Sequence, residues 1–146
     1  MDTLLNRLLL LGALLGLSLG AFAAGQDNAV EKVVYHINDS TVARAALGYI
    51  KNHLQATEGK AKIVVVTHGP GVDFLLEGAQ DKNGNPYDIN VDELSEKGVE
   101  FRVCNNTLKA RKIDPRLVLP NAKIVPSGVA EIGKLQAQEG YVYLKP

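Results

Sequence analysis

Residues 61–71 read AKIVVVTHGPG, a short stretch that indicates the class of fold. Ile63 to Val66 form a continuous aliphatic run with no polar alternation. Such a run is typical of a strand buried on both faces, as in a parallel sheet that is covered by helices. The Gly69-Pro70-Gly71 segment that follows predicts a turn directly after the strand.

Strand and helix patterns alternate on both sides of this stretch. Residues 32–37 (KVVYHI) are β-branched and aromatic, which predicts a first strand, and residues 42–54 carry apolar side chains at helical spacing. Further strands are expected near residues 99–103, 123–125 and 141–144, with helical segments near 72–79, 91–97, 106–113 and 129–138. The alternation predicts an α/β sandwich with a mostly parallel sheet of about five strands flanked by helices.

The N-terminal segment has the pattern of an export signal. Arg7 precedes an uncharged run over residues 8–23, and the run ends in Ala21-Phe22-Ala23, a small-x-small cleavage pattern. We therefore expect residues 1–23 to be a signal peptide and residues 24–146 to form one domain that is periplasmic or secreted. The alternative is an uncleaved membrane anchor, although the run is shorter than the roughly 20 residues of a spanning helix.

Charge excludes two classes of partner. The chain has 16 Lys and Arg residues against 16 Asp and Glu residues, so its formal net charge is zero. Without a cluster of basic residues there is no electrostatic basis for binding nucleic acid or an anionic membrane surface. We expect no nucleic-acid partner, and no membrane association after cleavage of the signal.

Cys104 is the single cysteine of the chain. It ends the predicted strand at 99–103, and the following residues, NNTL, predict the start of a helix. A thiol at the positive end of a helix dipole is favoured as thiolate, which is the nucleophilic form. The alternative is that Cys104 is a small buried hydrophobe, the common fate of a lone cysteine. Position alone leaves both readings open.

Other polar residues follow the predicted strands. Because ligands of open parallel sheets gather at the carboxyl ends of the strands, we expect these residues to converge near Cys104. His68 is the candidate catalytic partner of the thiol, or else bonds to its own turn. Asn38 and Asp39 either bind a ligand or cap the first helix. The candidate binding residues are Asn38, Asp39, Gly69, Asn105, Asn106, Thr107 and Ser127.

No metal or cofactor is expected. His36, His53 and His68 lie far apart in sequence without a close cysteine, and His53 is expected to face solvent from its helix. The glycines at 69 and 71 lack the spacing of a phosphate or dinucleotide loop. Positive residues near the thiol either stabilise its anion or form a solvated helix face: Arg102, Lys109, Arg111 and Lys112.

Five segments together resemble the DsrE/DsrF-like family: KVVYHI at 32–37, VTHGPG at 66–71, FRVCNNTL at 101–108, VPSGV at 125–129 and GYVYLKP at 140–146. The resemblance covers nearly the whole of residues 24–146. It implies a three-layer α/β sandwich similar to sulfur-relay subunits of the TusBCD type, in which a cysteine passes sulfur as a persulfide. It also implies trimers or hexamers. Asn105 stands where such relatives often have glycine.

Two functions follow as expectations. In the first, Cys104 carries a persulfide or acts in a sulfurtransferase-like reaction, His68 relays a proton, and sulfur donor and acceptor proteins are the partners. In the second, the protein is a non-catalytic module that binds a small ligand or assembles into an oligomer. Both expect a homo-oligomer and no cofactor.

Overall fold

The computed structural model describes residues 30–146. The predicted signal peptide at 1–23 lies outside these residues. None of the helices within 30–146 has the length and apolar character needed to cross a bilayer.

Five parallel strands form the single sheet of this region, in the order β4-β3-β2-β1-β5. The sequence prediction of an α/β fold with about five strands is confirmed, and every pairing is parallel. β2 holds the aliphatic run of residues 63–66, and the sheet buries that run on both sides. The strands are β1 (Lys32–Ile37), β2 (Lys62–Thr67), β3 (Glu100–Cys104), β4 (Ala122–Val125) and β5 (Val142–Leu144).

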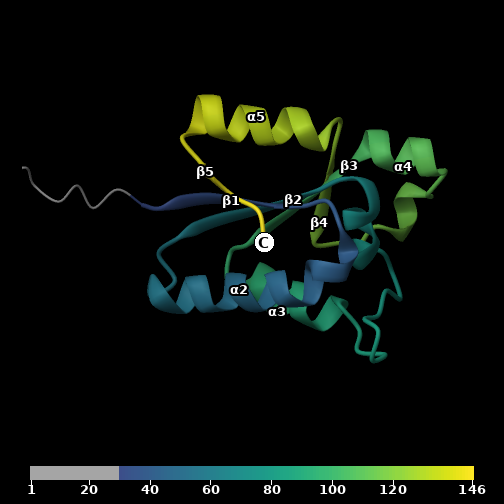
Figure 1. Ribbon diagram of the computed structural model, residues 1–146, viewed down its shortest axis with the longest axis horizontal. Coiled ribbons are helices and arrows are strands. Elements are labelled where there is room, and N and C mark those ends of the chain that lie inside the picture. The colour runs from purple at the N-terminus through teal and green to yellow at the C-terminus, as the bar shows by residue number, and fades with distance from the viewer. Residues whose placement is uncertain (1–29) are drawn as a thin grey trace, which may run out of the picture.

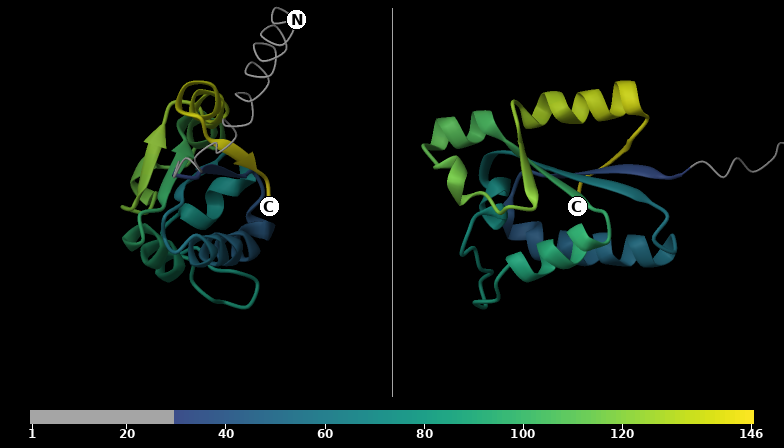
Figure 2. Two further views of the ribbon diagram at one scale, coloured as in Figure 1. Left: turned by 90° about the vertical axis from the view of Figure 1, so that its left-hand side faces the viewer. Right: turned by 180° about the vertical axis from the view of Figure 1, so that it is seen from behind.

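Helices cover both faces of the sheet and complete three layers. In Figure 1, α2 (Ala43–Ala56) and α3 (Asp88–Glu96) lie on one face, and α5 (Gly128–Glu139) lies on the other. Figure 2 shows the same arrangement along the strands and from behind. The short helix α4 (Asn105–Arg111) lies at the carboxyl edge of the sheet, beside the N-terminal end of α5.

The two faces pack cores of different size. Alternate residues of β1, β2 and β3 point toward α2 and α3, where 22 buried residues form one cluster that includes Phe74 and Phe101. The opposite residues point toward α5, where a second cluster has six members: Val34, Val64, Val66, Ile132, Leu135 and Tyr141. His36, His68 and Cys104 follow the same alternation onto the α5 face.

The connections after β3 and β4 bury side chains in different cores. From β3 the chain passes through α4 and η3 (Pro115–Leu117), and it buries Leu108 and Leu119 in the α2/α3 core. From β4 it enters α5 on the other face. Ligands of open α/β sheets bind at the carboxyl ends of the strands.

Two further 3₁₀ segments meet at this edge, η1 (Ser40–Val42) after β1 and η2 (Gly69–Leu75) after β2. They approach closely because residue 71 is glycine. A Cβ at Gly71 would lie 2.1 Å from the backbone oxygen of Ile37 and 2.8 Å from the Cα of Asn38. No larger side chain fits there, so Gly71 fixes the spacing between the two loops.

Candidate functional site

Cys104 is the last residue of β3 and the N-cap residue of α4. The predicted strand-to-helix position of the thiol is therefore confirmed. The residue is 4% exposed, so it is buried, but its surroundings are polar. It packs against the turn between β4 and α5, where a Cβ on Gly128 would lie 3.1 Å from the Cβ of Cys104.

Opposing effects act on the pKa of this thiol, and hydrogen bonding outweighs desolvation. Burial raises the pKa of Cys104, as it does for any group that becomes an anion. The backbone N–H groups of Gly128, Thr107 and Asn106, together with the Thr107 hydroxyl, lower it below the usual value of 9.0. The Asn106 N–H also donates to the carbonyl of Pro126 at 3.3 Å.

Two helices supply these donors. Asn106 and Thr107 belong to the first turn of α4, as the sequence predicted, whereas Gly128 follows β4 and begins α5. The hydroxyl of Ser127 accepts from the N–H of Ala130 at 3.4 Å and caps α5. The sulfur therefore faces first-turn N–H groups of both helices, which is a favourable environment for an anion.

Thr107 links the thiol to the loop after β2. Its Oγ1 accepts a hydrogen bond from the N–H of Gly69 at 2.9 Å. Since a hydroxyl has one proton to donate, this acceptor bond leaves the proton of Thr107 available for the sulfur. Gly69, Thr107 and Cys104, three of the predicted site residues, thus lie together.

His68 borders the same site. A Cβ atom added to Gly128 would lie 3.4 Å from the Cβ of His68 and 3.1 Å from the Cβ of Cys104. His68 and Cys104 therefore both lie against Gly128. Thr67 pairs with Val103 in the parallel register, which brings the next residues, His68 and Cys104, to the same level of the sheet. The predicted neighbourhood of His68 and Cys104 is present in the structure.

A second histidine and a tyrosine extend this site along the sheet edge. Nε2 of His36 lies 2.6 Å from Nε2 of His68, and Nδ1 of His36 lies 2.6 Å from the hydroxyl of Tyr143. Cys104, His68, His36 and Tyr143 come from β3, the end of β2, β1 and β5, so the row crosses four neighbouring strands. The sequence did not identify His36 or Tyr143 as site residues, because the position of β5 beside β1 is a property of the topology.

Two of the basic residues near Cys104 in sequence, Arg102 and Arg111, form ion pairs with other groups. Arg102 lies on the α5 face and forms ion pairs with Glu131 and, at 2.8 Å, with Glu100. Arg111 binds Asp73 at 2.6 Å and the carbonyl of Gly69 at 3.2 Å. The low pKa of the thiol therefore has its source in hydrogen bonds rather than in these cations.

Some predicted residues have other contacts. The carboxylate of Asp39 accepts from the N–H of Thr41 at 2.9 Å and caps η1, and this hydrogen bond lowers its pKa. Asn38 lies against Gly71. Asn105 begins α4 and is half-buried. Their proposed roles in ligand binding remain predictions.

The expectation that His53 faces solvent is wrong. Its imidazole lies between the hydroxyl of Tyr35, 2.9 Å from Nδ1, and the carboxylate of Glu31, 3.0 Å from Nε2, with 16% of the side chain exposed. Polar residues of β1 and its approach thus hold the ring against the sheet. Among residues 30–146, no group of three or more His, Cys, Asp or Glu side chains could hold a metal ion.

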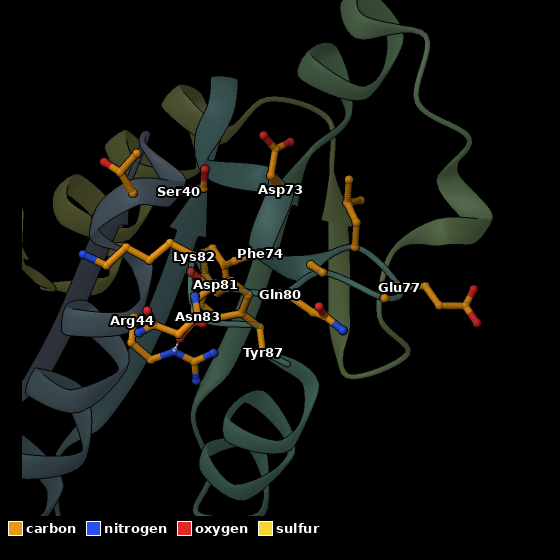
Figure 3. A pocket seen from close by; sticks show the side chains of 14 residues that line it. Ser40, Arg44, Asp73, Phe74, Glu77, Gln80, Asp81, Lys82, Asn83 and Tyr87 are labelled. Carbon is orange, nitrogen blue, oxygen red and sulfur yellow. Dashed lines mark hydrogen bonds and ion pairs between the residues drawn. The ribbon is translucent and has the colours of Figure 1, made fainter. Parts of the chain in front are cut away.

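A cavity of about 720 Å³ lies on the α2/α3 side, apart from Cys104 (Figure 3). Arg44 stacks over the ring of Tyr87, with its guanidinium carbon 4.3 Å from the centroid, and donates to Asp81 at 2.9 Å. Its further acceptors are the side chain of Asn90 and the backbone oxygens of Asn85 and Pro86. The 81–86 loop is therefore tied to α2 through Arg44.

Comparison with known proteins agrees with the fold and the motifs. The sequence model of the DsrE/DsrF-like family matches residues 31–146. The chain belongs to the DsrE/DsrF-like family. No curated protein matches the chain.

Two solved structures are similar to this DsrE/DsrF-like chain. The first is a protein of unknown function from Methanobacterium thermoautotrophicum, MTH1491, with 30% identity and a TM-score of 0.69. The second is the ychN protein from E. coli, with 15% identity and a TM-score of 0.63, which supports the fold alone. Each alignment covers 80% of this chain and 99% of the other.

Proposed function

We propose that this protein handles sulfur through Cys104, as a persulfide carrier with sulfurtransferase-like activity. Membership of the DsrE/DsrF-like family and the presence of a single cysteine fit a sulfur-related function. The observation that supports the finer proposal is the set of donors around the sulfur, which come from the first turns of α4 and α5 and from the Thr107 hydroxyl. These groups stabilise a thiolate, and they would stabilise the anion of a persulfide in the same way.

The proposed step is a nucleophilic transfer of a sulfane sulfur. The Cys104 thiolate attacks the outer sulfur of a donor persulfide, the S–S bond of the donor breaks, and the donor leaves as a thiolate. The new S–S bond lies on Cys104, and an acceptor thiolate later attacks its outer sulfur. No external oxidant or reductant is consumed, because one S–S bond forms for each that breaks. Separate donor and acceptor proteins are the expected partners.

Mass spectrometry of protein treated with polysulfide or thiosulfate tests this proposal. We expect a mass gain of one sulfur atom on the peptide that contains Cys104, reversed by a reducing thiol and absent from Cys104→Ser. A wild-type protein that gains no sulfur from either donor would refute the proposal.

A pair of Thr107 variants tests the donor set. Thr107→Val removes the hydroxyl that lowers the pKa of Cys104, whereas Thr107→Ser keeps it. Since a charge-assisted hydrogen bond contributes about 1.5–3 kcal/mol, Thr107→Val should slow sulfur uptake roughly tenfold at neutral pH and Thr107→Ser should change it little. Equal rates for both variants would show that the hydroxyl does not stabilise the anion.

The proposed location is the periplasm or the exterior of the cell. Its support is the uncharged run over residues 8–23 and the Ala21-Phe22-Ala23 pattern that ends it. N-terminal sequencing of protein purified from cells should begin at Ala24. A retained Met1 or Asp2 would indicate an uncleaved anchor instead.

We also propose a homo-oligomer, a trimer or hexamer. Family members often form oligomers, and apolar residues of β5 and α5 are exposed in the single chain: Val129, Val142, Tyr143 and Leu144. Sedimentation of the purified protein should give a trimer or hexamer. A monomer across the micromolar range would exclude this assembly.

A second candidate function is the binding of a small ligand in the cavity beside Arg44. Its volume of about 720 Å³ lies within the range of roughly 300–1,000 Å³ that is typical of ligand pockets. NMR screening of a fragment library would test it. Binding should perturb the amides of Ser40 and Asn83, which line the cavity, and leave those of Asn106 and Thr107 unchanged.

A further inference from the structure

Two residues in the row beside Cys104, His36 and Tyr143, have no role in the proposed function. His36 is half-buried and engages both of its ring nitrogens, Nε2 with Nε2 of His68 and Nδ1 with the hydroxyl of Tyr143, each at 2.6 Å. The rings of the two histidines lie 4.7 Å apart between centroids with a tilt of 32°. At these distances one atom of each pair must donate a proton and the other must accept it, so the protonation of the three groups is linked.

Two neutral arrangements satisfy both short contacts. In the first, His36 donates from Nδ1 to Tyr143 and accepts at Nε2 from the Nε2–H of His68, which leaves a lone pair on Nδ1 of His68. In the second, Tyr143 donates to His36, His36 donates from Nε2 to His68, and His68 carries its proton on Nδ1. The first arrangement alone lets His68 take a proton from the thiol, because in the second Nδ1 is already occupied.

A third arrangement has both nitrogens of His36 protonated, and the surroundings disfavour it. Burial, the neighbouring His68 and the ammonium of Lys145 all lower the pKa of His36 below 6.5. Arg102, which lies on the same face, forms ion pairs with Glu131 and Glu100. The lowered pKa favours the neutral imidazole of His36, whose free ring nitrogen can accept a hydrogen bond from His68.

We propose that His36 and Tyr143 are positioning residues that hold His68 in the tautomer protonated at Nε2, so that Nδ1 of His68 accepts the proton of the Cys104 thiol. In this step the S–H bond breaks, the sulfur keeps the electron pair, and an N–H bond forms on Nδ1. The resulting imidazolium donates its Nε2–H to His36, whose Nδ1–H remains donated to Tyr143. The other protons of His68, His36 and Tyr143 stay on their atoms during this step. The hydrogen bonds among these three residues are the same before and after His68 accepts the proton of the thiol.

This inference rests on the proposed function in one respect, that the Cys104 thiolate is the reacting group. It goes further by assigning an orienting role to two residues that do not touch the sulfur. An oriented histidine beside a nucleophile, held by a third group, is a general device for activating nucleophiles. Here the third group is a neutral histidine backed by a tyrosine rather than a carboxylate.

NMR of the full-length chain, expressed in cells with its ring nitrogens labelled with ¹⁵N and its cysteine Cβ with ¹³C, tests the proposal directly. The Cβ shift follows the ionisation of Cys104 without ambiguity because the chain has one cysteine, and it needs no reagent to reach a buried thiol. We expect nitrogen shifts that place the proton of His68 on Nε2 and that of His36 on Nδ1. A proton on Nδ1 of neutral His68 would overturn the assignment.

Variants separate positioning from a general effect on the fold. Tyr143→Phe removes the hydroxyl while keeping the ring, and it should reduce the thiolate fraction below the pKa by about threefold, equivalent to half a pKa unit. His68→Gln should cause an equal or larger loss. Adding Tyr143→Phe to His68→Gln should cause no further loss, because Tyr143 acts through His68. Tyr49→Phe, on the exposed side of α2, is the matched control and should have no effect.

Additive effects of Tyr143→Phe and His68→Gln would overturn the positioning role. The same proteins, treated with polysulfide, distinguish this failure from failure of the proposed function. Sulfur uptake together with additive variants retains the proposed function and refutes the inference. The expected tautomers and non-additive variants in a protein that takes up no sulfur refute the proposed function and retain the inference.

Discussion

The two faces of the sheet differ in what they bury. The face toward α2 and α3 buries one large cluster, in which side chains such as Phe74 and Phe101 are fully enclosed. The face toward α5 has six buried apolar residues, and at the carboxyl edge it turns polar, with His36, His68 and Cys104 in a row. The strands that form both faces are the same, so the difference lies in alternate residues of each strand.

This division separates stability from chemistry within one sheet. Polar groups at the site need hydrogen-bond partners, and the α5 face provides them through the first turns of α4 and α5. The α2/α3 face needs fewer, since most of its buried side chains are apolar, and burial of apolar area supplies most of its free energy. Substitutions on the α2/α3 face should therefore change the free energy of unfolding alone. Substitutions on the α5 face should change both the free energy of unfolding and the pKa of Cys104.

The largest expected effect is on the α2/α3 face. Phe101→Ala removes a fully buried ring from the larger cluster and should lower the free energy of unfolding by about 3–5 kcal/mol. The pKa of Cys104 should stay unchanged in the protein that remains folded, because Phe101 points away from the α5 face. Denaturant unfolding and NMR titration of the cysteine measure the two quantities.

Leu135→Ala is the counterpart on the α5 face. It should lower the free energy of unfolding by about 2–5 kcal/mol, since Leu135 is fully buried in the smaller cluster. It should also raise the pKa of Cys104, because looser packing of α5 displaces the N–H of Gly128. If both variants alter the thiol equally, the two faces are coupled and the proposed division is wrong.

A smaller effect is expected from Gly128→Ala, which tests the contact between α5 and the site. The added Cβ would meet the Cβ of Cys104 and the backbone oxygen of Thr67, each at 3.1 Å, and neither can rotate away. The helix start must shift, at a cost of about 1–3 kcal/mol. The same shift weakens the N–H bond to the sulfur, so the pKa of Cys104 should rise.

The matched control lies in the same helix. Gly133 is exposed, and a Cβ there would meet nothing within 4 Å, so Gly133→Ala should stabilise the protein by about 0.5–1 kcal/mol and leave the thiol unchanged. A Gly128→Ala protein with normal stability and a normal thiol pKa would show that the α5 terminus does not form part of the site.

The sequence was sufficient to predict the fold and the position of Cys104. Strong local patterns explain this success, since the aliphatic run of β2 and the strand-to-helix change at Cys104 are readable without tertiary information. The donors from Asn106 and Thr107 follow from the same local pattern. The hydroxyl of Thr107 also accepts a hydrogen bond from the N–H of Gly69. This contact joins two loops that the predicted strand order brings to one edge of the sheet, but the local sequence does not specify the bond.

The strand ends predicted that His36 and Gly128 lie at the same sheet edge as Cys104, but the contacts of these residues and of Tyr143 could not be predicted, because each depends on how distant segments meet. Gly128 reaches the sulfur because α5 crosses back over the sheet, and Tyr143 reaches His36 because β5 pairs with β1. His53 was misjudged for a related reason. A helical residue was assigned to solvent, although Tyr35 of the neighbouring strand supplies a hydrogen bond that holds it inward.

The smallest expected effect is on how the free energy of unfolding depends on pH. This dependence shows whether Cys104 lies in a site that favours its thiolate or in an apolar environment. The pKa of the folded thiol is lowered below 9.0, since hydrogen bonds outweigh burial, whereas the unfolded thiol has its ordinary value. An acid with a lowered folded pKa stabilises the folded state above its unfolded pKa, and this contribution is lost as pH falls through the folded pKa. Relative to Cys104→Ala, the free energy of unfolding of the wild type should therefore rise between neutral pH and 9.0.

Denaturant unfolding of the two proteins across this range measures the difference, and other titrating groups cancel because both proteins share them. Thr107→Val should flatten the rise, since it removes one of the donors that lower the pKa of the thiol. A difference that instead falls as pH approaches 9.0 would mean that burial dominates and that the folded thiol has a raised pKa. Cys104 would then behave as a small buried hydrophobe, and the polar edge of the α5 face would need another explanation.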